Sequence, residues 1–281
     1  MLFKMRILCL IPALIFFVIL PARGEELTPQ KFALVQKIAK ADGSDLQLIA
    51  LGPQLLEGLL PFTKKMPAQR SNALLAAMGE QFDGNRLFES YEANLAHEMR
   101  QESLEAVMPW YDSVTGHRIS ALQLRSNTPE AVTALKAYGA VLVKKPPSAA
   151  RIKLVRDLDQ AIKATDLLVD ITVNVTAGVL AGIAVVQKND GRAQVAQMRA
   201  QLAQLRKKVR PEIEQSLYVN FLYTFREATD AQLQEYVKFL GTPAGHLLSN
   251  ASYSALDDTL KGAAQRVGAS VGAEGSVKAD H

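Results

Sequence analysis

Two stretches of this chain, 129 residues apart, carry the same helical spacing of apolar residues. In each, four apolar residues fall at i, i+3, i+4 and i+7, which places them on one face of an α-helix. The first set is Leu104, Val107, Met108 and Tyr111, and the second set is Leu233, Tyr236, Val237 and Leu240. We therefore expect two tandem, sequence-related helical units, packed as a helical bundle or a short array.

A tight corner follows each of these helices, with the sequence SVTGH at 113–117 and TPAGH at 242–246. Ser113 and Thr242 are predicted to cap the next helix, because a hydroxyl oxygen accepts a hydrogen bond from the free N–H groups of its first turn. Pro243 suits the first helical position, where a missing N–H costs nothing. Each unit is thus expected to contain a helix, a corner and a second helix.

The corners also supply the candidate binding residues. Glycine in the first turn of a helix costs about 1 kcal/mol relative to alanine, so we expect another helix to approach closely at each corner glycine. The histidine after each glycine is interpreted either as a metal-binding or titrating pair, or as a residue that simply lies at the mouth of a corner. The neighbouring aromatic residues are either interface anchors or core. The candidates are Trp110, Tyr111, Gly116, His117, Phe239, Gly245 and His246.

Frequent helix start and stop signals predict an all-α fold. Thr28-Pro29 and Thr128-Pro129 each place a capping hydroxyl before a proline, and alternating strand patterns bounded by hairpin turns are nearly absent. We expect a first helical unit over residues 28–143, a linker at 144–150 and a second unit over 151–260. The remaining residues, 261–281, are rich in glycine, alanine, serine and charge, and are expected to be disordered.

The beginning of the chain is typical of a signal peptide. Lys4 and Arg6 precede an apolar run at 7–20, and small residues follow it up to Gly24. The run is too short to cross a hydrocarbon core of about 30 Å, so we expect cleavage after Gly24 and a periplasmic protein, with an uncleaved anchor as the alternative. The single cysteine, Cys9, lies inside the run, which leaves the mature chain without a disulfide or a lipid-anchoring thiol.

The charge of the mature chain argues against a nucleic-acid partner. The whole chain has a net charge of +4, and loss of Lys4, Arg6 and Arg23 with the signal lowers it to +1. The basic run at 206–210 has no interleaved aromatic residues on which bases would stack. We expect it to be a solvated helix face.

Residues 217–256 resemble the exported bacterial family known as domain of unknown function 2059. The hallmark of that family is Phe-Thr-x-x-Glu-Leu followed by Phe-Tyr-x-Ser-Pro-x-Gly, and this chain has ATDAQL at 228–233 and FLGTPAG at 239–245. A diverged first copy lies at 88–125. The departures from the hallmark are Ala228 for Phe, Gln232 for Glu, Leu240 for Tyr and Thr242 for Ser. The resemblance implies an exported helical domain and brings no catalytic residue with it.

No assembled catalytic motif is present in the sequence. His97-Glu98 begins like a zinc-protease helix, but Gln101 stands where the second histidine is needed, so we expect no metal and no cofactor. Our leading prediction is a non-enzymatic envelope protein that binds another envelope protein or itself. One alternative is an envelope hydrolase or metal-binding protein that uses His117 and His246, and a deep pocket that gathers His117, His246 or Glu227 would distinguish it. The other is a membrane-associated protein held by the apolar segment 167–186.

Overall fold

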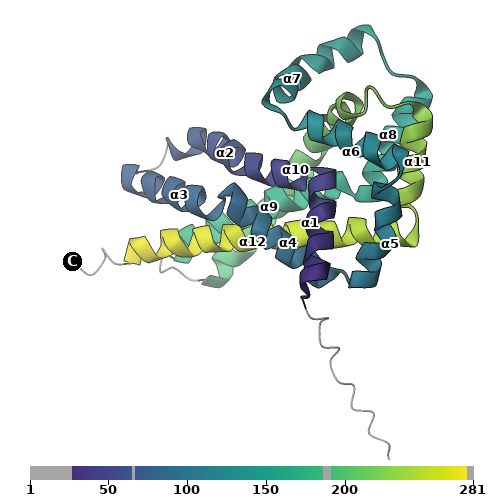
Figure 1. Ribbon diagram of the computed structural model, residues 1–281. Helices are drawn as coiled ribbons and strands as arrows, with labels where there is room; N and C mark the ends of the chain where they lie inside the picture. The colour runs from purple at the N-terminus through teal and green to yellow at the C-terminus, as the bar shows by residue number, and fades with distance from the viewer. Residues whose placement is uncertain (1–26, 65–66, 186–190, 277–281) are drawn as a thin grey trace, which may run out of the picture.

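The computed structural model describes residues 27–64, 67–185 and 191–276, and all regular structure in these ranges is α-helical (Figure 1). This confirms the predicted all-α class. The helices are α1 (Pro29–Asp42), α2 (Ser44–Thr63), α3 (Ala68–Gln81), α4 (Gly84–Glu98), α5 (Gln101–Tyr111), α6 (Val114–Ser126), α7 (Pro129–Lys144), α8 (Ala149–Ile162), α9 (Ala164–Val185), α10 (Gly191–Thr224), α11 (Asp230–Leu240) and α12 (Pro243–Ser276).

The predicted threonine caps are present at the starts of α1 and α7. The Thr28 side chain accepts a hydrogen bond from the Lys31 N–H at 3.2 Å, and the Thr128 side chain accepts one from the Ala131 N–H at 3.2 Å. The chain between α7 and α8 falls at residues 145–148, inside the predicted linker. The predicted signal peptide at 1–24 and the apolar run within it lie outside the described residues.

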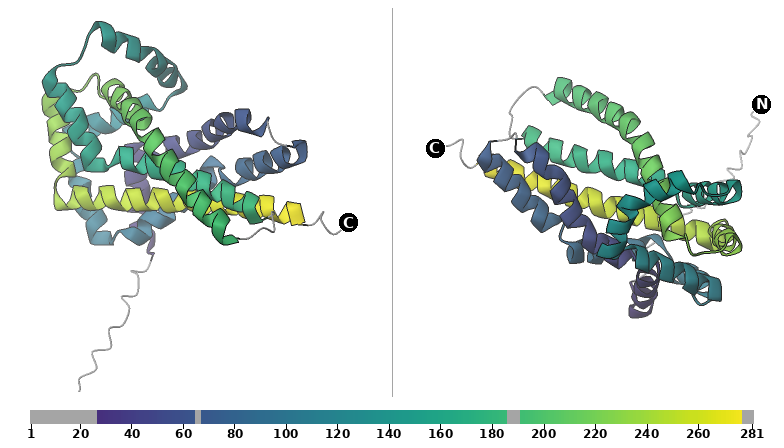
Figure 2. Two further views of the ribbon diagram at one scale, coloured as in Figure 1. Left: turned by 180° about the vertical axis from the view of Figure 1, so that it is seen from behind. Right: turned by 90° about the horizontal axis from the view of Figure 1, so that it is seen from above.

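The buried apolar residues form two clusters, and the two predicted units do not each enclose one of them. The first cluster joins α1 to α5 with α9 and α12, so helices from both units contribute to it. The second cluster joins α6, α8, α10 and α11, and Ile119 and Leu122 of α6 enter it from the first unit. Figure 2 shows α12 running as a long axis beneath α3 and α4 and beside α9. The core is therefore continuous across the predicted boundary.

Polar contacts line the seam where α9 meets α10 and α12. Residues 166, 170 and 174 recur at intervals of four, so they lie on one face of α9. Arg206 pairs with Asp170 at 2.5 Å, and Asn174 donates to Asp257 at 2.6 Å. The remaining contacts of the seam are Arg210 with Asp166 and Tyr253 with Asp170. These contacts provide partners for the polar side chains that interrupt the apolar segment 167–186. Residue 186 lies outside the described ranges.

None of the helices in the described ranges is both long and apolar enough to cross a bilayer.

The prediction of a disordered tail is wrong for residues 261–276, which continue α12. Ala263, Ala264 and Val267 are fully buried, and Val271 is nearly so. These small apolar residues lie at i, i+1, i+4 and i+8 and pack into the first cluster. Because alanine and valine are dispersed here among glycine, serine and charged residues, composition hid the helical spacing. Residues 277–281 lie outside the described ranges.

Pro211 lies inside a helix, although proline is most common at the first position of a helix. α10 passes through Pro211 without interruption. Arg206 and Arg210 form ion pairs with α9, and these pairs hold the turn of α10 just before the proline, where its missing N–H removes one backbone hydrogen bond.

Candidate functional site

The α5–α6 and α11–α12 corners share one hydrogen-bond pattern. Ser113 Oγ accepts from the N–H three residues further on at 2.9 Å and donates to the Trp110 carbonyl at 2.7 Å. Thr242 Oγ1 accepts from the equivalent N–H at 3.1 Å and donates to the Phe239 carbonyl at 2.7 Å. Both predicted caps are confirmed, and each hydroxyl also satisfies a carbonyl at the end of the preceding helix.

The corner glycines are required by the backbone of the corner itself. A Cβ atom on Gly116 would lie 1.9 Å from the Trp110 carbonyl oxygen, and one on Gly245 would lie 2.1 Å from the Phe239 carbonyl oxygen. We expected a second helix to approach at these points. The structure instead brings the end of the preceding helix against each glycine, so these two residues form the turn and are buried in it.

The candidate aromatic residues stack on one another across the two corners. Trp110 lies parallel to Phe239, with ring centroids 4.7 Å apart and an interplanar angle of 6°. It also stacks on Tyr236 at 5.4 Å and 10°. Tyr111 is 8% exposed and belongs to the first apolar cluster. These rings therefore pack the two corners together, with Tyr111 buried and Trp110 and Phe239 partly buried against both apolar clusters.

The two corner histidines are exposed, and no hydrogen bond joins them. His246 Nδ1 lies 3.0 Å from the amide nitrogen of Asn250, one turn further along α12. His117 makes no side-chain hydrogen bond or ion pair with any described residue. In the described part of the chain, no group of three or more His, Cys, Asp or Glu side chains is placed to hold a metal ion.

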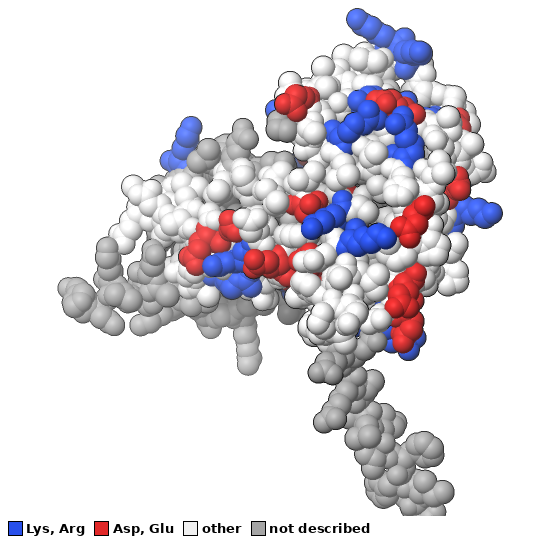
Figure 3. All heavy atoms as spheres, viewed as in Figure 1, with Lys and Arg blue, Asp and Glu red and all other residues white. Residues whose placement is uncertain are grey.

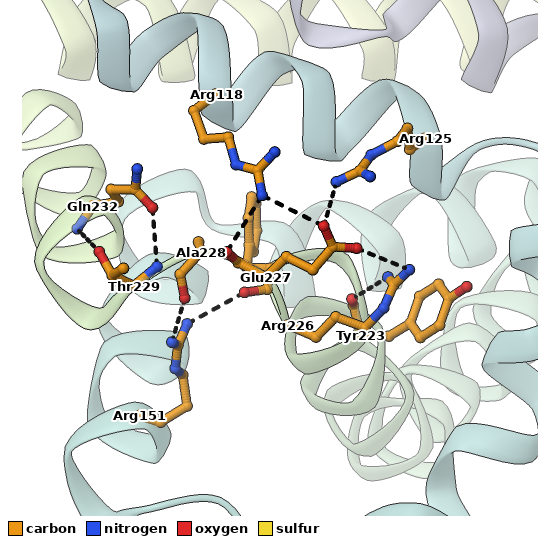
Figure 4. A network of polar contacts seen from close by, with 10 residues as sticks. Arg118, Arg125, Arg151, Tyr223, Arg226, Glu227, Ala228, Thr229 and Gln232 are labelled. Atoms are coloured by element: carbon orange, nitrogen blue, oxygen red, sulfur yellow. Dashed lines mark hydrogen bonds and ion pairs between the residues drawn. The ribbon is translucent and has the colours of Figure 1, made fainter.

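Glu227 lies on the turn between α10 and α11, where three guanidinium groups converge on its carboxylate (Figure 4). Arg125 lies 2.9 Å from it, Arg118 3.4 Å and Arg226 3.6 Å. The hydrogen bond from Arg125, together with the charges of all three arginines, lowers the pKa of Glu227. A carboxylate held in its ionised form in this way is a poor proton donor, so the geometry does not suit Glu227 to general-acid chemistry.

Arg151 of α8 fixes the same turn from the opposite side. Its guanidinium donates to the Ala228 carbonyl at 2.6 Å and to the Phe225 carbonyl at 3.4 Å, and it pairs with Asp230 at 2.8 Å. Only 18% of the Arg151 side chain is exposed. Arg151 therefore holds the backbone of this turn in place independently of the contacts made by the Glu227 carboxylate.

A part-buried carboxyl group that the sequence did not indicate lies where α1 ends. Asp42 Oδ1 accepts hydrogen bonds from the Ser44 N–H at 3.0 Å and the Ser44 hydroxyl at 2.6 Å. Burial raises the pKa of Asp42 to about 7. Burial and the charge of Asp42 likewise raise the pKa values of three nearby tyrosines, Tyr91, Tyr111 and Tyr236. In the sequence, Asp42-Gly43 indicated only a helix break.

An open groove of about 700 Å³ runs between α7 and α10. Its lining is mostly apolar and includes Leu135, Pro211 and Val219, with Lys136 and Glu212 as its charged residues. The groove contains none of the predicted site residues. Sequence reasoning missed it because it depends on how two helices from different predicted units cross.

α7 beside this groove leaves an apolar surface open to solvent. Val132 is 40% exposed, Val141 50% and Val143 84%. In Figure 1, α7 stands out from the rest of the helices and is joined to them by a loop at each end. The sequence carries a signal for this exposure, because the apolar residues of α7 occur all around the helix instead of along one stripe.

No protein-family model, curated protein or solved structure matches this chain. The resemblance of residues 217–256 to domain of unknown function 2059 consequently stays a prediction.

Proposed function

We propose that this chain is an exported, non-enzymatic protein of the bacterial cell envelope that acts by binding another protein. The observation that supports this most directly is the exposure of Val132 and Val143, which share one face of α7, together with the groove beside that helix. Exposed apolar patches of this kind on a soluble protein commonly mark interaction sites. A groove between two helices suits an amphipathic helix, which inserts its apolar residues and leaves its polar face in water.

The partner that fits this surface is a helix with an apolar face, either from another envelope protein or from a second copy of the chain. The groove is bordered by Lys136 and Glu212, one charge of each sign. A helix whose flanking charges alternate would therefore be accepted more readily than a strongly acidic or basic one.

Site-specific photo-crosslinking in intact cells tests this surface. A photoreactive residue at Val143 is expected to capture the partner, and one at Val114 is expected not to. The pair is well matched, because Val114 is 86% exposed and Val143 84%, yet Val114 lies at the end of α6 remote from α7. Equal capture from both positions, or none from Val132, Val141 and Val143, would overturn the proposal, and the mass of the adduct separates a second copy from another protein.

We also propose that the chain contains two tandem, related units. Support comes from positions outside the corners. α1 and α8 each contain 14 residues, and each ends in a residue with left-handed backbone, Gly43 with φ 77° and Lys163 with φ 54°. In both, the N–H of this residue bonds to the carbonyl four residues earlier. An experimental structure in which α1–α2–α5–α6 fails to superpose on α8–α9–α11–α12 would contradict this duplication.

Export can be tested independently by fractionating cells and measuring the intact mass of the protein. A periplasmic species that begins at Glu25 is expected, because cleavage after Gly24 removes the basic start and the apolar run. A full-length species held in the membrane would contradict export with cleavage, and would support an uncleaved anchor.

A further inference from the structure

The turn that carries Glu227 has an excess of positive charge that other ion pairs of the described chain lack. Elsewhere a carboxylate typically faces a single cation, as in Lys37–Asp112 and Lys153–Asp157. Here one carboxylate faces Arg118, Arg125 and Arg226, which leaves a local charge of +2. Figure 3 shows basic side chains gathered around acidic atoms at the upper right of the molecule, over the region of α6.

Two of the three guanidinium groups, those of Arg118 and Arg226, are also held by contacts that do not depend on the Glu227 carboxylate. Arg118 and Arg125 are seven residues apart on α6, two helical turns along one face. Arg118 also lies 3.5 Å from the backbone carbonyl of Glu227. Arg226 donates to the Tyr223 carbonyl at 2.7 Å and lies 4.1 Å above the Tyr223 ring. Arg118 and Arg226 are therefore pre-organised, which reduces the entropy lost when a ligand binds, whereas among the described residues Arg125 is held only by Glu227.

Most of the N–H groups of these arginines point to no protein acceptor. Arg118 and Arg125 each use Nη2 for their contacts with Glu227, and their remaining guanidinium N–H groups have no partner among the described residues. The three side chains are 39%, 52% and 37% exposed, so a ligand in solution reaches them directly. A planar guanidinium has five N–H donors, and its fork matches the oxygens of a phosphate.

We propose that Arg118, Arg125 and Arg226 form a binding site for a phosphate monoester, and that Glu227 acts as an internal competitor. A dianionic phosphate offers three oxygens with more charge than a carboxylate, so it can engage all three guanidinium groups at once. The Glu227 carboxylate is the group that now accepts from these donors. On binding, the phosphate takes its place, and the carboxylate swings out to water from the turn that Arg151 keeps fixed.

The phosphate has two sources in a cell envelope, a free phosphorylated molecule or the headgroup of a lipid. Both present the same chemistry to the arginines. They differ in that a lipid headgroup lies on a surface, where further basic residues near the bilayer add to the attraction. This inference is independent of the groove beside α7, so failure of either proposal leaves the other standing.

Binding is tested by titrating the mature protein with inorganic phosphate while following the arginine Nε–Hε and the turn amide signals by NMR. We expect saturable shifts at Arg118, Arg125 and Arg226, with a dissociation constant on the order of millimolar because the site is exposed. Glu227→Gln keeps the shape of the side chain and removes its charge. It is expected to tighten phosphate binding about fivefold, and Arg118→Gln with Arg125→Gln to weaken it more than about tenfold.

Glu80→Gln and Arg86→Gln are the matched controls. Glu80 and Arg86 form an exposed ion pair at 3.5 Å outside this site. Glu80→Gln changes the net charge by the same +1 as Glu227→Gln, and Arg86→Gln removes one positive charge, half of the change in the double variant. Neither is expected to alter phosphate binding. The proposal is overturned if Glu227→Gln binds phosphate no better than Glu80→Gln does, or if the arginine signals do not move in the original protein or in Glu227→Gln.

Sedimentation with vesicles separates the two sources. The probes are vesicles of phosphatidylcholine alone and vesicles that also contain phosphatidic acid, whose headgroup is a phosphate monoester. Sedimentation that requires phosphatidic acid and is lost in the Arg118→Gln, Arg125→Gln double variant identifies a lipid headgroup. Phosphate binding without sedimentation identifies a free ligand, and the absence of both contradicts the site.

Discussion

Trp110 and Phe239 stack face to face with ring centroids 4.7 Å apart, and each is the residue whose carbonyl receives the capping hydroxyl of its own corner. The contact thus joins equivalent positions of the two corners. The carbonyl of each residue is also the atom that excludes a side chain at the corner glycine. One pair of aromatic residues therefore links the local geometry of both turns to the packing between them.

Removal of this stack is expected to destabilise the protein through the loss of both buried area and ring contact. Trp110→Ala and Phe239→Ala should each lower the free energy of unfolding by about 2–4 kcal/mol, since both rings are part-buried. Chemical denaturation of the two variants and the double variant measures their coupling. We expect about 0.5–1.5 kcal/mol of coupling for a stacked aromatic pair. Strictly additive losses would mean that the rings do not support each other.

The corner glycines should tolerate no side chain. Gly116→Ala and Gly245→Ala place a Cβ atom about 2 Å from a backbone oxygen, which cannot move without opening the turn. We expect each variant to lose more than about 3 kcal/mol of stability. Gly79→Ala and Gly139→Ala are the controls, because nothing lies within 4 Å of a Cβ atom at either position. In these helix interiors alanine should be neutral or stabilise by up to about 1 kcal/mol.

If Gly245→Ala unfolds at the same denaturant concentration as Gly79→Ala, the close approach in the corner does not exist in solution. Thermal unfolding monitored by circular dichroism gives the same comparison with little material.

Local signals in the sequence predicted the elements of this fold well, because they act within a few residues. Thr28, Ser113 and Thr242 were predicted as caps from a hydroxyl at the start of a helix, and the structure contains each of these caps. A cap requires only a hydroxyl and a free N–H in the next turn. The tertiary environment does not alter that requirement, so caps can be predicted from the local sequence.

Longer-range features could not be predicted in the same way. The Asp42 carboxyl is surrounded by tyrosines from α4, α5 and α11, whose convergence depends on the crossing of several helices. The groove between α7 and α10 has the same origin. The arginines around Glu227 come from α6 and from the turn itself, so their distance in sequence concealed the site.

Composition predicts that the C-terminal part of α12 is disordered, whereas the structure shows it as a helix packed on the first cluster. Truncation tests which of the two holds in solution. A chain that ends at Lys261 lacks Ala263, Ala264, Val267 and Val271, which are buried against the first cluster. We expect it to be less stable by several kcal/mol, since each buried methyl-bearing side chain contributes about 1 kcal/mol or more. A chain that ends at Ser276 is the control and should unfold like the full mature protein. Equal unfolding midpoints for the two truncated chains would mean that residues 262–276 add no stability, as expected for a disordered tail.

The part-buried Asp42 carboxyl predicts an unusual dependence of stability on pH. Its pKa is about 7 in the folded protein and 3.8 in the unfolded chain, so the folded state binds the proton more tightly. The resulting stabilisation is complete below about pH 4 and is lost as the pH rises to about 7. Glu92, whose pKa burial also raises, adds a contribution of the same sign. Urea unfolding of the mature protein across this interval should show a falling midpoint.

Asp42→Asn isolates the contribution of this one carboxyl. The amide oxygen can still accept from the Ser44 N–H and hydroxyl, and it carries no charge at any pH. We expect the variant to match the original protein near pH 4 and to exceed its stability by roughly 2 kcal/mol near pH 8, less than the full shift because the side chain is part-exposed. Glu92→Gln is the control and should retain most of the slope. A slope that is unchanged in Asp42→Asn would place the titrating group elsewhere in the molecule.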